Sequence, residues 1–168
     1  MNTQIRPAAT VILIREGADD FEIFMVKRST KSAFGSLYVF PGGTLDEEDS
    51  LQDMYQYCEG LNDAQASAKL GLKEDGLAYW VACIRECFEE VGVLLTNKND
   101  LLLCNTKKLV EYREKLNSKE ITFYDICKEN NLQLRANNIV PCAHWVTPDI
   151  EPKRFDTRFF LAKVHSEQ

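Results

Sequence analysis

Apolar residues along the chain form several short runs, and these runs predict strands. Residues 8–14 read AATVILI, a β-branched apolar run typical of a buried strand. The run FEIFMV at residues 21–26 follows a short turn, so the two segments together predict a hairpin. Residues 37–40 predict a short third strand that leads into a glycine pair. Two more strands are predicted further along the chain, at residues 139–147 and 154–162.

A helical period replaces the strand pattern in the middle of the chain. An apolar stripe at steps of three and four residues predicts a helix, and its members are Val81, Ile84, Phe88 and Val91. We expect this helix to end at Gly92, because glycine adopts the left-handed conformation at a helix C-terminus without a Cβ penalty.

Shorter helices are predicted on both sides of this central helix. Two helical pieces lie around residues 51–57 and 63–70, and glycines follow them. Another helix is predicted at residues 106–116. Ser118 is the expected N-cap of a further helix that continues to about residue 130.

Length, net charge and apolar runs exclude several classes of protein. At 168 residues the chain has the common size of one domain, so we expect residues 1–168 to fold as a single domain. Its net charge of -6 argues against sequence-independent nucleic-acid binding, which needs a basic surface. No apolar run has the length of a membrane span, and residues 1–7 do not resemble a signal peptide. We expect a cytoplasmic protein that binds neither nucleic acid nor membrane. The sequence does not give the oligomeric state, and a homo-oligomer is possible.

Six cysteines and two histidines give little support for a zinc site, because no CxxC pair occurs. Cys83 and Cys87 lie one helical turn apart, as half of a zinc site would. Small buried apolar residues in a reducing, intracellular compartment are the better interpretation.

Three carboxylates gather at the end of the predicted central helix. Glu86, Glu89 and Glu90 stand at i, i+3 and i+4, which places them on one face of the helix. Like charges at this spacing repel, and the last turn is the negative end of the helix dipole. Arg85 supplies one positive charge. A divalent cation would supply the rest, and Mg²⁺ prefers carboxylate oxygens alongside substrate phosphates. The alternative is a solvated acidic face.

Two segments together resemble the two halves of the Nudix box, the signature of the Nudix hydrolases. They are FPGG at residues 40–43 and RECFEEVGV at residues 85–93. The resemblance implies an α/β fold, a Nudix-type α/β/α sandwich with a mixed sheet and a catalytic strand–loop–helix. It also implies hydrolysis of a nucleoside diphosphate linked to another moiety, with Mg²⁺ or Mn²⁺ as cofactor. The expected partner is therefore a small-molecule nucleoside diphosphate derivative.

The same resemblance assigns roles to individual residues. It makes Glu89 and Glu90 the principal metal ligands, helped by the backbone carbonyl of Gly42. Glu86 is the general base or a further metal ligand. Arg85 orients a glutamate by a charge-assisted hydrogen bond.

Glycines mark the turns of the motif at Gly42, Gly43 and Gly92. The glycine pair permits a close approach of the backbone that a side chain would obstruct. A tight turn and a metal-ligating carbonyl are both compatible with this pair.

The loop between the two halves of the motif is much longer here than in most Nudix proteins, since residues 44–79 intervene. We expect a helical insertion at about residues 46–78, and the helical pair at about 106–130 to cap it. Direct counting from the glycines makes Asp49 the counterpart of the first glutamate of the motif, and Glu48 is as plausible. The long insertion resembles one branch of the family, which includes coenzyme A and acyl-coenzyme A diphosphatases.

Basic residues supply candidates for phosphate binding. Arg28 follows a predicted strand, and alternation places Arg154, Asp156 and Arg158 on one face of another. These arginines could form an anion-binding wall for a substrate phosphate. The alternative for the Arg-Asp-Arg trio is a cross-strand ion network. The surrounding sequence, EPKRFDTRFFLA, also resembles the long-insertion branch.

The resemblance points to coenzyme A or an acyl-coenzyme A as substrate, while NADH and nucleotide sugars stay open. In Nudix proteins another strand and a helix usually follow the last strand seen here. We therefore expect either a truncated chain, which could leave a sheet edge or an apolar face uncovered, or a fold that closes differently. The alternative function is a catalytically impaired Nudix-like domain that binds a nucleotide or a protein partner.

Overall fold

A mixed β-sheet forms the centre of the molecule in the computed structural model, which describes residues 4–27, 37–97 and 105–164. The strand order is β2-β1-β7-β6, and β5 also pairs with β1. Strands β1 and β7 are parallel, whereas β2, β5 and β6 pair with their neighbours antiparallel. A separate two-stranded ladder joins β3 and β4. The bounds are β1 (Ile5–Glu16), β2 (Phe21–Phe24), β3 (Val26–Lys27), β4 (Tyr38–Val39), β5 (Gly42–Thr44), β6 (Ile139–Val146) and β7 (Arg154–Lys163).

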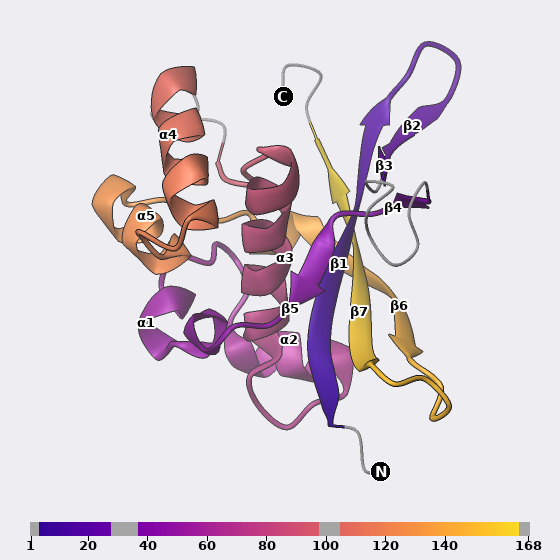
Figure 1. The fold of residues 1–168 in the computed structure, drawn as a ribbon. Coiled ribbons are helices and arrows are strands. Elements are labelled where there is room, and N and C mark those ends of the chain that lie inside the picture. Colours follow the sequence, from indigo (N-terminus) through magenta and orange to yellow (C-terminus); the bar gives the residue numbers. More distant parts are fainter. Residues whose placement is uncertain (1–3, 28–36, 98–104, 165–168) are drawn as a thin grey trace.

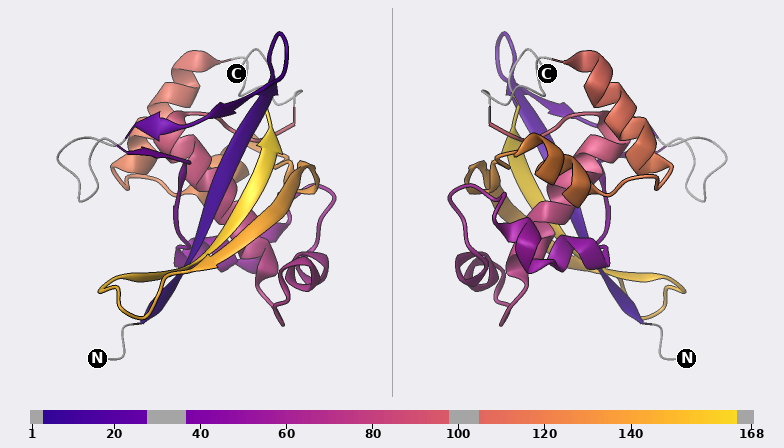
Figure 2. Two further views of the ribbon diagram at one scale, coloured as in Figure 1. Left: turned by 90° about the vertical axis from the view of Figure 1, so that its right-hand side faces the viewer. Right: turned by 90° about the vertical axis from the view of Figure 1, so that its left-hand side faces the viewer.

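The described helices all lie on one face of this sheet (Figures 1 and 2). The mixed sheet with helices confirms the predicted α/β class. A helical layer on the opposite face, as in a complete α/β/α sandwich, is not found among the described residues. The helices are α1 (Gln52–Tyr55), α2 (Asp63–Leu70), α3 (Gly76–Val91), α4 (Thr106–Asn117) and α5 (Phe123–Asn130), with 3₁₀ turns η1 (Glu47–Ser50) and η3 (Ala136–Asn138).

Helix α3 is the element around which the core is built. Every residue from Gly76 to Arg85 is buried, because this helix packs between the sheet and the other helices. Trp80 makes an edge-on contact with Phe160 of β7 at a ring separation of 4.8 Å, and its indole N–H donates to the Ile139 carbonyl at 3.0 Å. Burial of such aromatic side chains contributes about 1.5–3 kcal/mol each. Cys83 and Cys87 are fully buried in this core.

The predicted end of the central helix is confirmed. Gly92 has φ 76°, in the left-handed region, and its N–H donates to the Phe88 carbonyl at 2.9 Å. The helix at residues 106–116 also matches α4, and α2 covers the range predicted for it.

Two local predictions were wrong. Ser118 is the C-cap of α4 and not the N-cap of the next helix. Helix α5 instead begins after Thr122, whose hydroxyl accepts from the Asp125 N–H while the Asp125 carboxylate accepts from the Thr122 N–H. This reciprocal capping satisfies two donors and outcompetes a lone serine four residues earlier.

The pair Gly42–Gly43 forms the short strand β5 instead of a tight turn.

The sheet face away from the helices carries exposed apolar side chains. On β6, Trp145 pairs with Thr157 of β7 and Val140 pairs with Leu161 of β7. Thr157 and Leu161 point to the face opposite that of Phe160, which is buried against the helices. Trp145 is 62% exposed and Val140 is 56% exposed. These two strands therefore present exposed apolar side chains on the face away from the helices. Within the part of the chain that is described, no helix combines the length and apolar character needed to cross a bilayer.

Candidate active site

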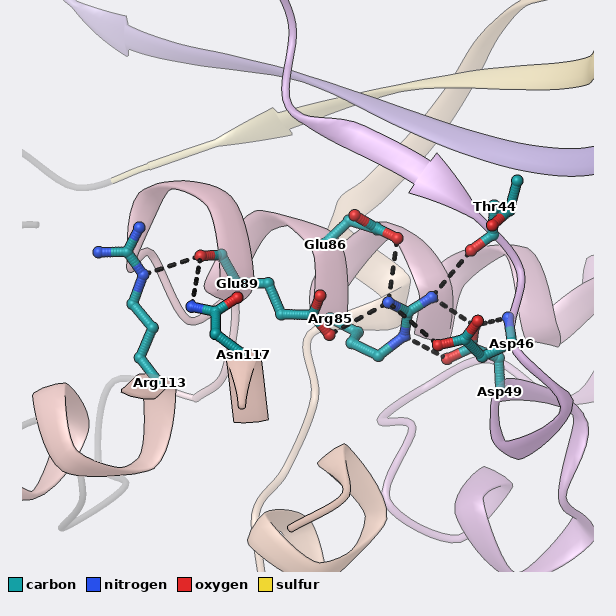
Figure 3. Close-up of polar contacts among 8 residues, drawn as sticks. All are labelled: Thr44, Asp46, Asp49, Arg85, Glu86, Glu89, Arg113 and Asn117. Atoms are coloured by element: carbon teal, nitrogen blue, oxygen red, sulfur yellow. Dashed lines mark hydrogen bonds and ion pairs between the residues drawn. The ribbon is translucent and has the colours of Figure 1, made fainter. Parts of the chain in front are cut away.

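The guanidinium group of Arg85 lies at the centre of the candidate site (Figure 3). Arg85 is 5% exposed, and it forms a two-pronged ion pair with Asp49, with Nε–Oδ1 2.9 Å and Nη2–Oδ2 2.8 Å. Nη2 also donates to the carbonyl of Thr44 at 3.0 Å. A planar fork bound to a carboxylate in this way fixes both groups. Of the two residues that the sequence left open, Asp49 binds this guanidinium, and no ion pair between Glu48 and Arg85 is found among the described residues.

The third nitrogen of the same group faces the helix carboxylates. Nη1 of Arg85 donates to Glu86 Oε1 at 3.0 Å and to Glu89 Oε1 at 3.1 Å. Oδ2 of Asp46 lies further from Nη1 of Arg85, at 3.7 Å. One positive charge thus faces several negative charges, and the cluster carries an excess of negative charge.

The local sequence explains why Asp49 reaches Arg85. The turn η1 begins after Asp46, whose backbone N–H donates to Asp49 Oδ2 at 2.8 Å. This turn holds the Asp49 carboxylate, which is 1% exposed, towards α3. The insertion therefore contributes a buried partner to the helix motif.

The glycine pair lies between β1 and the carboxylates of α3. A Cβ on Gly43 would collide with the carboxylate of Glu86, and a Cβ on Gly42 would lie 2.5 Å from the Ala9 carbonyl oxygen. The N–H of Gly42 donates to Glu90 Oε2 at 3.0 Å. Glycine is required here because β5 passes too close to β1 and α3 for a side chain.

Burial shapes the electrostatics of the carboxylates. It raises the pKa of Glu86 to about 7, with Arg85 opposing this rise and the charges of Glu89 and Glu90 adding to it. Burial likewise raises the pKa of Glu89 and of Asp49, against the attraction of Arg85. Such shifts arise because a desolvated negative charge is costly unless a positive charge is close.

The donor set has the chemistry that a divalent cation needs. Carboxylate oxygens and backbone carbonyls are the ligands that Mg²⁺ prefers. In the described ranges, however, no three Asp, Glu, His or Cys side chains converge as a metal site. Glu86 and Glu89 turn towards Arg85, whereas Glu90 turns towards the Gly42 amide. Metal binding at these residues stays a prediction, and it would require the carboxylates to turn towards one another.

The arginines predicted to bind phosphate lie in different surroundings. Arg28 falls outside the described residues. Arg154 binds the Thr147 carbonyl at 3.1 Å and pairs with Asp149 at 2.5 Å. Arg158 donates from Nη1 to the Leu70 carbonyl of α2 at 2.9 Å.

Strands β6 and β7 also share an ion network. Asp156 accepts from His144 of β6 at 2.6 Å and lies 3.5 Å from Nε of Arg158. For Asp156 and Arg158, this arrangement favours the ion-network interpretation over the anion-binding wall.

Two residues that the sequence analysis missed contact the end of α3. Arg113 and Asn117, both on α4, bind backbone carbonyls in its last turn (Figure 3). The sequence offers only a weak indication of a role for Arg113, which follows Tyr112 at the edge of the apolar stripe of α4. That position indicates a side chain next to the packed face, but not what it binds.

A pocket of about 420 Å³ adjoins the carboxylate cluster. It lies between the start of the insertion, α3 and the linker between α4 and α5. Arg85 and Glu89 line it together with Glu48, Phe123 and Tyr124. The helical pair and the insertion therefore enclose a space beside the motif.

Comparison with known proteins agrees with this architecture. A family profile described as the NUDT19 Nudix domain matches residues 61–167. The chain is 27% identical to the acyl-coenzyme A diphosphatase NUDT19 of Xenopus laevis, over 91% of the chain and 50% of that protein. It is 28% identical to the putative nudix hydrolase 7 of Caenorhabditis elegans, over 96% of the chain and 45% of that protein. The chain thus spans about half the length of these relatives.

Solved structures give the same result for the fold. A NUDIX hydrolase from Alicyclobacillus acidocaldarius superposes with a TM-score of 0.68 and 26% identity, covering 98% of this chain and 72% of that one. A MutT/nudix family protein from Enterococcus faecalis superposes with a TM-score of 0.51 and 14% identity, over 98% of this chain and 38% of that one. The second likeness concerns the fold alone.

Proposed function

This chain belongs to the NUDT19 Nudix domain family, and from that premise we propose that it hydrolyses diphosphate bonds with the help of a divalent metal ion. The proposed substrate is a nucleoside diphosphate derivative. Water attacks one phosphorus of the diphosphate, the bridging P–O bond breaks, and the two products leave as phosphate monoesters.

We propose coenzyme A or an acyl-coenzyme A as the substrate. The relative from Xenopus laevis is named an acyl-coenzyme A diphosphatase. The long insertion at about residues 46–78 also resembles the coenzyme A diphosphatase branch of the family. Cleavage of such a substrate yields an adenosine bisphosphate and a phosphopantetheine or acyl-phosphopantetheine.

The observation that carries the proposal is the excess of negative charge held around Arg85. Asp49, Glu86 and Glu89 all bind this one guanidinium and are largely buried, and Asp49 and Glu89 line the adjoining pocket. A cluster of this kind raises the free energy of the folded protein unless it binds a cation. A purely structural ion pair would need one carboxylate, as in the Asp49 fork.

Glu86, Glu89, Glu90 and the Gly42 carbonyl are the residues that would hold Mg²⁺ or Mn²⁺. When bound, such an ion neutralises charge on the phosphate oxygens and acidifies a water molecule. Arg85 donates to Oε1 of Glu86 and to Oε1 of Glu89 and so orients both carboxylates. Glu86 lies against Gly43 and is the proposed proton acceptor for the attacking water.

The experiment that tests this function is a product assay with purified protein. Coenzyme A, an acyl-coenzyme A, NADH and an ADP-sugar are each incubated with Mg²⁺, with Mn²⁺ or with a chelator, and products are separated by chromatography. We expect cleavage of the coenzyme A substrates that needs the metal. Metal binding without cleavage of any substrate would contradict the proposal and favour the alternative of a nucleotide- or protein-binding domain.

A matched pair of variants tests the site. Glu89→Gln keeps the volume and removes the charge of a proposed ligand, so we expect kcat to fall at least about 100-fold with the fold retained. Glu114→Gln removes an exposed carboxylate on α4 and should leave kcat unchanged. Full activity of Glu89→Gln would refute the assignment of Glu89.

A further inference from the structure

The last turn of α3 is bound by a side chain from another helix. The final carbonyls of an α-helix have no partner within the helix. The Phe88 carbonyl accepts from the Gly92 N–H at 2.9 Å. The next two carbonyls accept from Arg113 of α4, with Nε to Glu89 O at 2.9 Å and Nη2 to Glu90 O at 2.6 Å. Asn117 Nδ2 adds a longer contact to Glu89 O, at 3.4 Å (Figure 3).

The charge of Arg113 also suits its place. The C-terminus of a helix is the negative end of its dipole, and a cation there is favourable. This turn also carries the carboxylates of Glu89 and Glu90, so a cation at this end faces negative charge from side chains as well. The guanidinium fork reaches both carbonyls at once, which a lysine cannot do with the same geometry. The neighbours of Arg113 on α4, Tyr112 and Leu116, are buried and hold the helix in place.

We propose that Arg113 is a positioning residue that fixes the backbone of the two proposed metal ligands, Glu89 and Glu90. Arg113 binds the backbone carbonyls of these two residues, and no contact with their carboxylates is found among the described residues. It therefore acts through the position of the helix turn. Arg85 binds the carboxylate of Glu89 and the Gly42 amide binds that of Glu90, whereas Arg113 holds the backbone of both residues. The inference rests on the proposed metal-dependent function.

The test compares Mg²⁺ binding in the wild type with three variants, measured by calorimetry without substrate. Arg113→Ala should weaken Mg²⁺ binding by about 10- to 100-fold, the usual cost of losing a group that supports metal ligands. Arg113→Lys retains the charge, and its Mg²⁺ affinity should lie between those of the wild type and Arg113→Ala. Lys107→Ala removes one positive charge from an exposed position on the same helix and should bind Mg²⁺ within about twofold of wild type. Wild-type affinity in Arg113→Ala would overturn the proposal.

Activity and hydrogen exchange separate positioning from general stability. At saturating Mg²⁺, kcat of Arg113→Ala should recover most of its wild-type value, because the ligands themselves are intact. Amide exchange at residues 89–92 should be faster in Arg113→Ala and unchanged in Lys107→Ala. Unchanged exchange at residues 89–92 would overturn the inference. If Arg113→Ala does not fold, Arg113→Lys carries the same comparison.

The design distinguishes failure of this inference from failure of the proposed function. A wild-type protein that neither binds Mg²⁺ nor cleaves a diphosphate refutes the metal-dependent function, and with it the role of Arg113 towards a metal. A wild type that binds Mg²⁺ with the same affinity as Arg113→Ala leaves the function intact and refutes the role of Arg113.

Discussion

Two ion clusters among the described residues, one around Arg85 and one around Asp156, differ in charge balance and in exposure. Around Arg85, one guanidinium faces Asp49, Glu86 and Glu89, and the side chain of Arg85 is 6% exposed. On the sheet, Asp156 lies between a histidine and an arginine, and its side chain is 34% exposed. In this balanced cluster the negative charge of Asp156 already lies beside the positive charge of Arg158, at 3.5 Å from its Nε. The unbalanced one is costly by itself, and this difference points to the helix cluster as the functional site.

The largest expected effect comes from removing the central cation. Arg85→Ala leaves Asp49, Glu86 and Glu89 without their shared partner, so we expect a loss of about 3–5 kcal/mol in the free energy of unfolding. Urea denaturation of the metal-free protein at pH 7 measures this. Arg85→Lys keeps the charge without the two-pronged geometry and should lose less. A loss below about 1 kcal/mol for Arg85→Ala would mean that the cluster is not held by this residue.

A smaller change in the free energy of unfolding is expected at Glu86, where substitution should stabilise the protein instead of destabilising it. Its pKa in the folded, metal-free protein is raised to about 7, chiefly by burial, above the unfolded value of 4.5. The stability that this group contributes is therefore fully present below pH 4.5 and is lost as pH rises through 7. Glu86→Gln does not ionise, so without divalent metal it should be more stable than wild type by up to about 3 kcal/mol at pH 8.

Denaturation at a series of pH values checks this prediction. The difference between Glu86→Gln and wild type should be near zero at pH 4 and should grow between pH 4.5 and 8. Glu114→Gln, at an exposed position, serves as the control and should show little difference at any pH. A constant difference across this range would contradict burial of an ionised Glu86.

The smallest effect is expected in the balanced cluster. Asp156→Asn keeps the shape of the side chain and a hydrogen-bond acceptor for His144, and the pair is partly exposed. Exposed ion pairs contribute about 0–1 kcal/mol, so we expect a loss below about 1 kcal/mol and no change in Mg²⁺ affinity. Thermal unfolding with and without Mg²⁺ measures both. A reduced response to Mg²⁺ would show that the two clusters are coupled and would weaken the contrast between them.

The elements with strong local signals were predictable from the sequence. The β-branched run of β1 and the glycine after α3 gave the correct strand and the correct helix end. The start of α5 was not predicted, because two capping residues compete locally and the reciprocal Thr122–Asp125 pair wins. The strand β5 was not predicted either, since a three-residue glycine-rich strand has no periodic signal and exists only through pairing with β1.

The candidate site was predicted only in part, for a related reason. Three of its carboxylates share one helix, so helical spacing alone placed them together. The partners supplied by other elements, Asp49 and Arg113, depend on how η1 and α4 pack against α3. Contacts between distant segments leave no spacing pattern in a single sequence. Counting from the glycines left Asp49 and Glu48 as alternatives, and only the fold separates them.

The parallel pairing of β1 with β7 has a consequence for the order in which the protein folds. Residues 5–14 pair with residues 154–163, so the centre of the sheet joins segments made at very different times. Contacts of such high sequence separation slow folding, because the entropy of a long loop must be lost before they form. During synthesis at about 5–20 residues per second, β1 waits roughly 7–30 s for its partner. Until then β1 can pair with β2 and β5, which are made earlier, while the edge of β1 that faces β7 lacks its strand partner.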